Sequence, residues 1–307
     1  MTNLSKLRKT SVSRTPTGEI TKKVDEKKDA NWKAFDETKR SGHFMKIGIT
    51  ERGDASLDFT WHKKLDSIDG AIIITKNLTD AVIDRLITAS KPIILHATCT
   101  GWGGTVIEPR IPEYKKQLSQ IQKLIDRGFP KENIVLRVDP ILPFDISIKI
   151  NNEIVNINGI SVAERVITDA VAMGLLPGLR VRISLLDAYK HTKERLIAAT
   201  GVNQEIYNGA FQAPAGTFAK IAERFSKFGI IFETCAEPEL AAINSCFVST
   251  GCVGETDLKL MGLAVPTNTS INPQNRGGCR CLACKTELLE NKKRCPYQCA
   301  YCYWKDN

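Results

Sequence analysis

The sequence predicts an α/β fold in which six strand–helix units form a partial β/α barrel. From Phe44 onward, short apolar runs typical of buried strands alternate with stretches of helical period, which is the pattern of a parallel sheet. Polar side chains follow each expected strand, and no Gly-x-Gly-x-x-Gly motif follows the first one. Both observations favour a barrel over an open doubly wound sheet, the other arrangement that these units allow.

The expected strands come in chain order and are separated by helices and one insertion. They span residues 45–50, 71–75, 93–97, 134–138, 180–184 and 230–234. Two helices are indicated by apolar residues at helical spacing, namely Tyr114, Leu118, Ile121 and Leu124, and Val162, Val166, Ile167 and Val171. Residues 145–160 alternate isoleucines with polar residues, which predicts an inserted hairpin or long loop.

Composition divides the 307 residues into three segments. Residues 1–40 are rich in Lys, Thr, Ser and Asp without a sustained period, which predicts a basic tail outside the fold. Residues 41–270 form the expected barrel domain, and residues 271–307 form a cysteine-rich segment that closes its mouth. No apolar run approaches the roughly 18 residues of a membrane span, and the N-terminus lacks a signal-like stretch. We therefore expect a cytoplasmic protein with no membrane partner.

The net charge of +9 is concentrated at the two ends of the chain. Residues 1–46 contain twelve Lys/Arg and six Asp/Glu, and residues 276–307 contain seven and three. Basic flanks around a neutral body suit a polyanion such as nucleic acid, because phosphate contacts provide affinity without sequence preference. The alternative is a solvated surface with no such partner.

Three cysteines near the C-terminus give the strongest chemical signal. Cys295, Cys299 and Cys302 have the spacing C-x3-C-x2-C, so three thiolates can hold three corners of a [4Fe–4S] cube. This is the ligand set of radical-SAM enzymes, in which the open iron binds S-adenosylmethionine and Tyr301 takes the aromatic position beside the adenine. A zinc ribbon formed by Cys281, Cys284, Cys299 and Cys302 is the alternative, but it leaves Cys279 and Cys295 unexplained.

Several motifs together make a family resemblance specific. They are IGITERGD at 47–54, ITKN at 74–77, TCTGWG at 98–103, RVDPIL at 137–142, ETCAE at 233–237 and the block CPYQCAYC at 295–302. This series resembles a bacterial family of unknown function that looks like a rearranged relative of radical-SAM proteins, and it covers about residues 44–304. The cysteine block is also similar to that of the spore photoproduct lyase group, which repairs DNA.

The resemblance implies a TIM-like barrel of the radical-SAM type, with one departure from the usual pattern. Only five residues follow Cys302, so the helix and Gly-Gly-Glu strand that normally contact S-adenosylmethionine must be replaced. The expected replacements stand at the ends of the first two strands: Thr50, Arg52, Asp54, Thr75 and Lys76.

Four other cysteines are candidates for a second [4Fe–4S] cluster. Cys235 ends a strand, Cys252 follows a glycine, and Cys279 and Cys281 form a close pair; the resemblance places cysteines at these four positions. Cys246 competes with Cys252. The alternative is that cysteines in apolar surroundings are ordinary buried residues.

Arg137 and Asp139 are candidates for the reacting groups because residues i and i+2 of a strand face the same side. Arg137 would hold a carboxylate, and Asp139 would orient it or move a proton. Glu233, on another strand, is a third candidate. For all three residues, the alternative is a structural ion pair inside the barrel.

The expected function is a radical-SAM enzyme that generates a 5′-deoxyadenosyl radical and acts on a nucleobase or nucleotide, in repair or modification. It requires a reductase, flavodoxin or ferredoxin as electron donor. One alternative is a zinc- or cluster-stabilised nucleic-acid-binding protein without catalysis, and another is a radical-SAM enzyme acting on a small metabolite or peptide.

Overall fold

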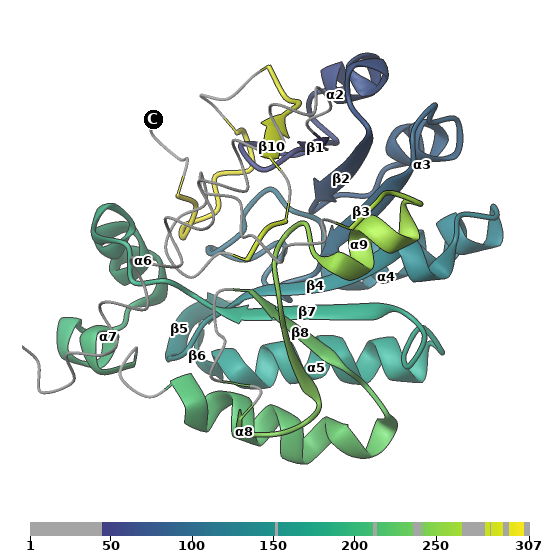
Figure 1. Ribbon diagram of the computed structural model, residues 1–307. Coiled ribbons are helices and arrows are strands. Elements are labelled where there is room, and N and C mark those ends of the chain that lie inside the picture. The colour runs from purple at the N-terminus through teal and green to yellow at the C-terminus, as the bar shows by residue number, and fades with distance from the viewer. Residues whose placement is uncertain are drawn as a thin grey trace, which may run out of the picture. The chain divides into compact units, whose positions relative to one another are not determined.

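A mostly parallel sheet forms the centre of the protein (Figure 1). The computed structural model describes residues 45–303, except 151–152, 211–213, 236–239, 241, 266–279, 283 and 291–294, so the expected tail at 1–40 lies outside the described residues. The eight strands have the order β10-β1-β2-β3-β4-β7-β8-β9, and each neighbouring pair is parallel. They are β1 (Lys46–Ile49), β2 (Gly70–Thr75), β3 (Ile93–Thr98), β4 (Ile134–Ile141), β7 (Arg180–Leu185), β8 (Phe232–Cys235), β9 (Phe247–Thr250) and β10 (Cys284–Glu287).

The predicted α/β class is confirmed, and each of the six expected strands is present. From β1 to β9 the strands follow one another in chain order, so this run has no reversal of the kind that defines a doubly wound sheet. No pairing within the described part of the chain joins β9 to β10, so the sheet is open there. Closure into a barrel is therefore not observed.

One face of the sheet is covered by four amphipathic helices, α3 (Asp80–Ile87), α4 (Tyr114–Asp126), α5 (Gly159–Ala172) and α8 (Pro214–Phe225). Figure 1 shows α5 and α8 along the same side of β7 and β8. Side chains such as Ile73, Leu136 and Phe232 point toward these helices in one core cluster. Because strand side chains alternate, their neighbours Ile72, Val135 and Glu233 belong to the opposite face.

The shorter elements surround this framework. They are helices α2 (Thr60–Lys63), α6 (Lys193–Thr200), α7 (Gln204–Ala210) and α9 (Glu255–Leu260), and the hairpin of β5 (Asp145–Ile150) and β6 (Glu153–Asn158). The hairpin confirms the predicted insertion at 145–160. The helical periods around Tyr114 and Val162 are likewise confirmed by α4 and α5.

Strand β10 brings the cysteine-rich segment back to the beginning of the fold. It pairs with β1 from Lys46↔Cys284 to Ile49↔Glu287. The Glu287 carboxylate then accepts hydrogen bonds from the amides of Glu51 and Arg52, at 3.1 and 2.9 Å. The loop after β1 is thereby fixed beside the C-terminal segment.

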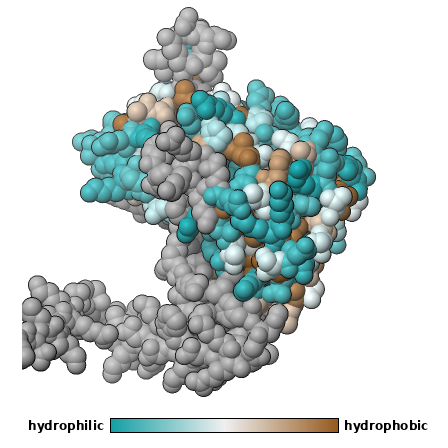
Figure 2. Space-filling model, turned by 90° about the horizontal axis from the view of Figure 1, so that it is seen from above, coloured by the Kyte–Doolittle hydropathy of each residue, from teal (hydrophilic) through white to brown (hydrophobic). Residues whose placement is uncertain are grey.

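Among the described helices, none combines the length and apolar character needed to cross a bilayer. On the face seen in Figure 2, hydrophobic side chains are scattered among hydrophilic ones.

Candidate functional site

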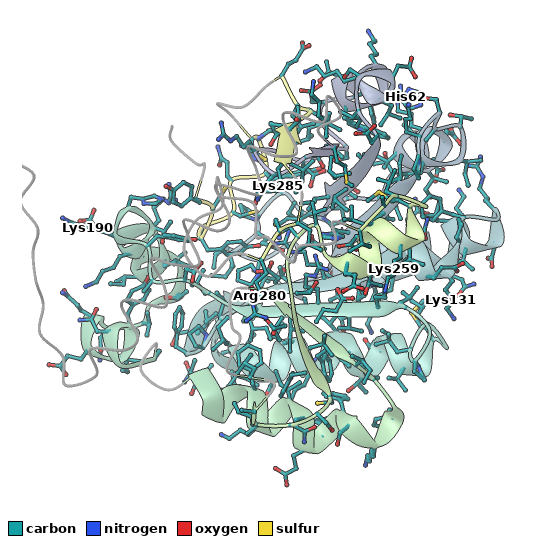
Figure 3. All side chains as sticks on the ribbon, viewed as in Figure 1. His62, Lys131, Lys190, Lys259, Arg280 and Lys285 are labelled. Carbon is teal, nitrogen blue, oxygen red and sulfur yellow. The ribbon has the colours of Figure 1, made fainter. Side chains whose placement is uncertain are left out.

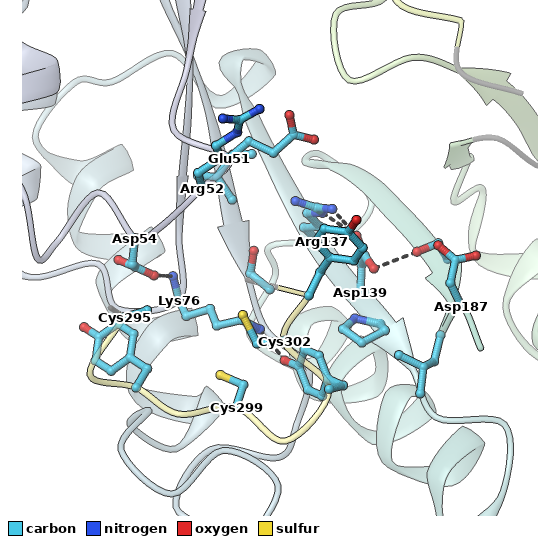
Figure 4. Close-up of a pocket in the computed structure, with 18 of the residues that line it drawn as sticks. Glu51, Arg52, Asp54, Lys76, Arg137, Asp139, Asp187, Cys295, Cys299 and Cys302 are labelled. Atoms are coloured by element: carbon cyan, nitrogen blue, oxygen red, sulfur yellow. Dashed lines mark hydrogen bonds and ion pairs between the residues drawn. The ribbon is translucent and has the colours of Figure 1, made fainter. Parts of the chain in front are cut away.

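A pocket of about 310 Å³ lies at the carboxyl ends of the strands. Its walls come from residues that end or follow β1, β2, β3, β4, β7 and β9, and from residues 295–303, which we call the cysteine loop. Figure 4 shows the cysteine loop on one side of the pocket and Arg137, Asp139 and Asp187 on the other. Residues far apart in sequence thus meet around one space.

All three cysteines of the C-x3-C-x2-C motif line this pocket. The Cys302 amide donates to the Cys299 carbonyl at 3.1 Å, which makes a tight turn. Gln298, just before Cys299, has φ of 54° and is the single non-glycine residue with positive φ in the described chain. Such left-handed conformations are uncommon outside glycine and recur at ligand sites.

The cysteine loop is held by hydrogen bonds from several separate segments. The Tyr297 hydroxyl lies 2.7 Å from Ser56 Oγ and accepts a bond of 3.1 Å from Asn77 Nδ2. The Ala300 amide donates to the Ile107 carbonyl at 2.8 Å. Arg195 of α6 donates to the Cys302 carbonyl at 2.6 Å. The loop is therefore fixed against the segments that follow β1, β2 and β3.

Burial dominates the chemistry of two of the loop thiols. It raises the pKa of Cys295 to about 11 and raises that of Cys299 further, while the nearby ammonium of Lys76 acts in the opposite direction. Both thiols therefore stay protonated at neutral pH unless a metal displaces their protons.

Lys76 belongs to a buried polar group beneath the cysteine loop. Its ammonium lies 2.8 Å from Glu108 Oε1 and 2.6 Å from the Tyr301 hydroxyl, which itself donates to Glu108. Thr100 Oγ1 donates to the other Glu108 oxygen at 2.6 Å. Burial lowers the pKa of Lys76, but Glu108, Cys299 and Asp139 together outweigh that effect, so the pKa is raised. Lys76 is thus held as a cation beside Cys299.

Glu108 was not anticipated from sequence. It is fixed by the glycine-rich loop after β3, where the Gly104 amide donates to the Glu108 carbonyl at 3.1 Å. The Trp102 amide donates to Thr100 Oγ1 at 3.2 Å. The loop after β3 thus forms a tight turn that positions the Glu108 carboxylate.

The residues expected to contact S-adenosylmethionine divide into two groups. Arg52, Asp54 and Lys76 line the pocket. Thr50 and Thr75 are fully buried and are not among the lining residues. Thr75 Oγ1 donates to Asp54 Oδ1 at 2.7 Å, and the Lys76 amide donates to Asp54 Oδ2 at 2.7 Å. Thr75 therefore positions Asp54 rather than facing the pocket.

Arg137 and Asp139 both line the pocket and form an ion pair with each other. Arg137 Nε donates to Asp139 Oδ2 at 2.6 Å, and Ser184 Oγ donates to Asp139 Oδ1 at 2.6 Å. Asp139 is held rigidly from two strands, with its carboxylate on the side opposite the cysteine loop (Figure 4).

Glu233 occupies a different environment and is not one of the lining residues. Its carboxylate contacts Arg180 Nε at 2.7 Å and Arg182 Nη2 at 2.6 Å, and Asp257 contacts Arg180 Nη1 at 2.7 Å. Burial raises the pKa of Glu233, but Arg182 and Arg180 outweigh it, so the pKa is lowered. This placement favours the structural ion pair over a reacting group.

Parts of the expected second cysteine group also converge. Cys252 lines the pocket, and in the sheet Cys235 pairs with Thr250, two residues before Cys252. A Cβ atom on Gly251 would lie 2.6 Å from the Cys281 amide nitrogen, so the two segments are in close backbone contact. Cys279 and the side chain of Cys235 lie outside the described residues. Cys246, the competitor of Cys252, packs in the core on the helix side.

The arrangement of the cysteines bears on which metal group they suit. In the described part of the chain, no three His, Cys, Asp or Glu side chains come close enough to bind one ion together. A zinc ion requires sulfurs about 2.3 Å from a common centre. A cluster instead gives each cysteine its own iron, and soft thiols are its typical ligands. Of the zinc-ribbon set, Cys281 belongs to one hydrophobic cluster and Cys299 to another, so these two described side chains are not gathered at one point.

Comparison with family models and with curated proteins places this chain. No curated protein matches the chain. A family model described as "Domain of unknown function (DUF1848)" matches residues 60–304, which include the sheet from β2 onward, the cysteine loop and the pocket residues other than those at 51–54. Because this match covers most of the 307 residues, the chain belongs to the DUF1848 family.

Proposed function

We propose that this protein is a radical-SAM enzyme whose pocket holds a [4Fe–4S] cluster on Cys295, Cys299 and Cys302. The observation that carries the proposal is that all three cysteines line one pocket at the carboxyl end of a parallel sheet. Such a cluster supplies one electron for reductive cleavage of S-adenosylmethionine, which yields a 5′-deoxyadenosyl radical. The buried surroundings of Cys299 suit this chemistry because they keep water away.

We further infer that the six central strands, β1-β2-β3-β4-β7-β8, correspond to the partial (β/α)6 barrel of radical-SAM proteins. Their parallel pairing in unbroken chain order supports this, as does the position of the pocket at their carboxyl ends. Strands β10 and β9 would then be additions at the two edges.

The chain's own residues have distinct roles in this proposal. Lys76, fixed by Glu108 and Tyr301, supplies positive charge beside the thiolates. Asp54 presents a buried carboxylate near Cys295, suited to an ammonium group. Arg137 and Asp139, on the opposite wall, would orient the substrate or hold a proton.

A nucleobase or nucleotide is the proposed substrate, and a reductase, flavodoxin or ferredoxin is the proposed electron donor. The basic ends of the chain support a phosphate-bearing partner. A base in a duplex would have to leave the stack to enter a pocket of this kind.

The decisive experiment is metal analysis of anaerobically purified and reconstituted protein. We expect brown protein with about four iron and four sulfide per cluster. When this protein is reduced in the presence of S-adenosylmethionine, we expect it to form 5′-deoxyadenosine. Cys302→Ala should abolish that product, whereas the matched variant Cys284→Ala should retain it. Colourless protein with one zinc, or equal loss in both variants, would contradict the proposal. If 5′-deoxyadenosine forms but its yield does not respond to added nucleotides or nucleic acid, the substrate would instead be a metabolite or peptide.

We also propose a second cluster on Cys235, Cys252, Cys279 and Cys281. The close contact of the Cys252 and Cys281 segments supports it, as do Arg137, Arg182 and Lys285, which all interact electrostatically with Cys252. A triple alanine variant of Cys295, Cys299 and Cys302 should keep about four iron per chain. Introducing Cys281→Ala into this triple variant should remove the remaining iron, whereas introducing Cys246→Ala should leave it bound. Iron-free triple variants would refute the second cluster.

A further inference from the structure

Three aromatic side chains form a wall at the pocket. None of them is among the proposed cofactor contacts. We call Tyr189, His191 and Tyr303 the aromatic wall. The ring of Tyr303 lies 4.9 Å from that of Tyr189 and 4.7 Å from that of His191, both edge-on. Tyr189 and Tyr303 line the pocket, and Tyr303 remains 42% exposed. A large exposed aromatic ring at a pocket wall offers a face for stacking.

The wall is built rigidly and is tied to the cysteine loop. His191 Nε2 lies 3.2 Å from the Tyr303 carbonyl, and the Tyr189 carbonyl accepts a bond of 3.0 Å from Thr192 Oγ1. Arg195, from the helix that follows, fixes the Cys302 carbonyl at 2.6 Å. Tyr303 is the residue directly after Cys302, so a ring stacked on this wall would lie next to the proposed cluster.

Asp187 gives the wall a hydrogen-bonding preference. It is exposed, lines the same pocket, and accepts a bond of 2.7 Å from the Tyr189 hydroxyl. An ionised carboxylate only accepts hydrogen bonds, and its two oxygens can take several donors. The planar ring that suits Asp187 therefore carries N–H donors on its edge, as amino-bearing bases do.

A cation stands on the same segment. Lys190 is exposed between Tyr189 and His191, in the short helix η3 (Lys190–Thr192). Figure 3 shows it projecting outward beside α6. It makes no ion pair with any residue that the structure describes. Lys190 is not among the lining residues, so the phosphate that it would contact is one that extends out of the pocket from a base on the wall.

We propose that the aromatic wall binds an amino-bearing nucleobase by stacking, with Asp187 accepting from its exocyclic amine and Lys190 contacting its phosphate. This deepens the proposed function and rests on it for the reaction, but the binding itself requires no catalysis. The same nucleotide unit can come from a free mononucleotide or from a single strand of nucleic acid.

The test is calorimetric binding to the reconstituted protein with AMP, UMP, ribose 5-phosphate and a short single-stranded oligonucleotide. AMP should bind at least tenfold more tightly than ribose 5-phosphate, and more tightly than UMP. Tyr303→Leu should weaken AMP binding about 5- to 150-fold, the range expected for one stacked base. Tyr189→Leu should act in the same direction, and Tyr303→Phe should retain binding. Phe228→Leu is the matched control, because Phe228 is 40% exposed on a different element.

Two further variants test the polar contacts. Asp187→Asn should reduce the preference for AMP over UMP, because an amide also presents donors. Lys190→Gln should weaken AMP and ribose 5-phosphate equally and reduce the salt dependence of oligonucleotide binding by about one phosphate contact. Tighter binding of the oligonucleotide than of AMP assigns the base to a nucleic acid strand, and the reverse assigns it to a free nucleotide.

Three results would overturn the inference. They are no binding of AMP or oligonucleotide, equal effects of Tyr303→Leu and Phe228→Leu, and competition between AMP and S-adenosylmethionine, which would make the wall part of the cofactor site. Iron content and absorbance near 400 nm are recorded for each variant. Failure of the proposed function appears there as absent iron, whereas failure of the aromatic wall leaves the iron intact.

Discussion

Replacing Glu233 by glutamine separates a structural from a reacting role for this residue. Its carboxylate makes three contacts with two guanidinium groups, at 2.7 Å to Arg180 Nε and at 2.6 and 3.1 Å to Arg182 Nη2 and Nε. The Arg182 side chain is 2% exposed and that of Glu233 is 11% exposed, so water cannot take the place of the lost charge. After the substitution, both cations depend on the single carboxylate of Asp257.

Removing one partner of a buried ion pair costs about 3 to 5 kcal/mol. The glutamine oxygen still accepts one hydrogen bond, whereas its amide group faces the other guanidinium as a second donor. We therefore expect the free energy of unfolding to fall by about 3 kcal/mol at pH 7, the lower end of that range. Glu164→Gln is the matched control, because its partner Arg224 lies 2.8 Å away but is 54% exposed. It should cost less than about 1 kcal/mol.

The pH dependence gives this prediction a second readout. The pKa of Glu233 lies below its ordinary value of 4.5 in the folded protein, so its contribution is complete above that pH and is lost as the pH falls through the folded pKa. The difference between wild type and Glu233→Gln, measured by urea unfolding, should shrink below pH 4.5. Equal costs for Glu233→Gln and Glu164→Gln would refute the reasoning. Loss of 5′-deoxyadenosine with unchanged stability would indicate a reacting group instead.

Substitutions at Glu108, Gln298 and Gly103 test other parts of the structure, with Gly209→Ala as a control. Glu108→Gln should cost about 2 to 3 kcal/mol at pH 7 in urea unfolding. That deficit should shrink as the pH rises toward 10.5, because loss of Glu108 lowers the pKa of Lys76 in the folded variant relative to the folded wild type, so the variant loses less stability as Lys76 deprotonates. Gln298→Gly should raise the melting temperature slightly, and Gln298→Val should lower it, because φ of 54° is strained for a β-branched residue. Gly103→Ala should destabilise by about 1 to 3 kcal/mol, because its Cβ would collide with backbone atoms. Gly209→Ala, in open space on α7, should stabilise slightly; equal effects at the two glycines would contradict the packing argument.

The six central strands were predictable because each is a short apolar run whose burial on both faces leaves a local signal. Strands β9 and β10 have no such signal: FVST and CKTE are four residues long and partly polar, and their pairing depends on strands far away in sequence. For the same reason Thr50 and Thr75 could be placed at strand ends but not recognised as buried supports.

Site residues that belong to a recognisable sequence motif could be predicted. Site residues that reach the pocket only through tertiary contacts could not. The spacing of Cys295, Cys299 and Cys302 identified one wall of the pocket. Glu108 stands in a loop without a pattern of its own, and only its contact with Lys76 reveals its role. Likewise, nothing in the sequence distinguishes Tyr303, which simply follows the last cysteine. Its position beside Tyr189 arises from tertiary packing.

The pairing of β1 with β10 has a consequence for how the protein is made. Lys46 and Cys284 are neighbours in the sheet although more than two hundred residues separate them, so one edge of β1 stays unpaired while the ribosome synthesises everything between. Contacts of such long range form slowly, and an exposed strand edge invites pairing with other chains. The cysteine loop follows β10 and is fixed by the same assembly. Assembly of the proposed cluster would therefore be a late event in biogenesis, and a nascent chain stalled before β10 would be vulnerable to aggregation.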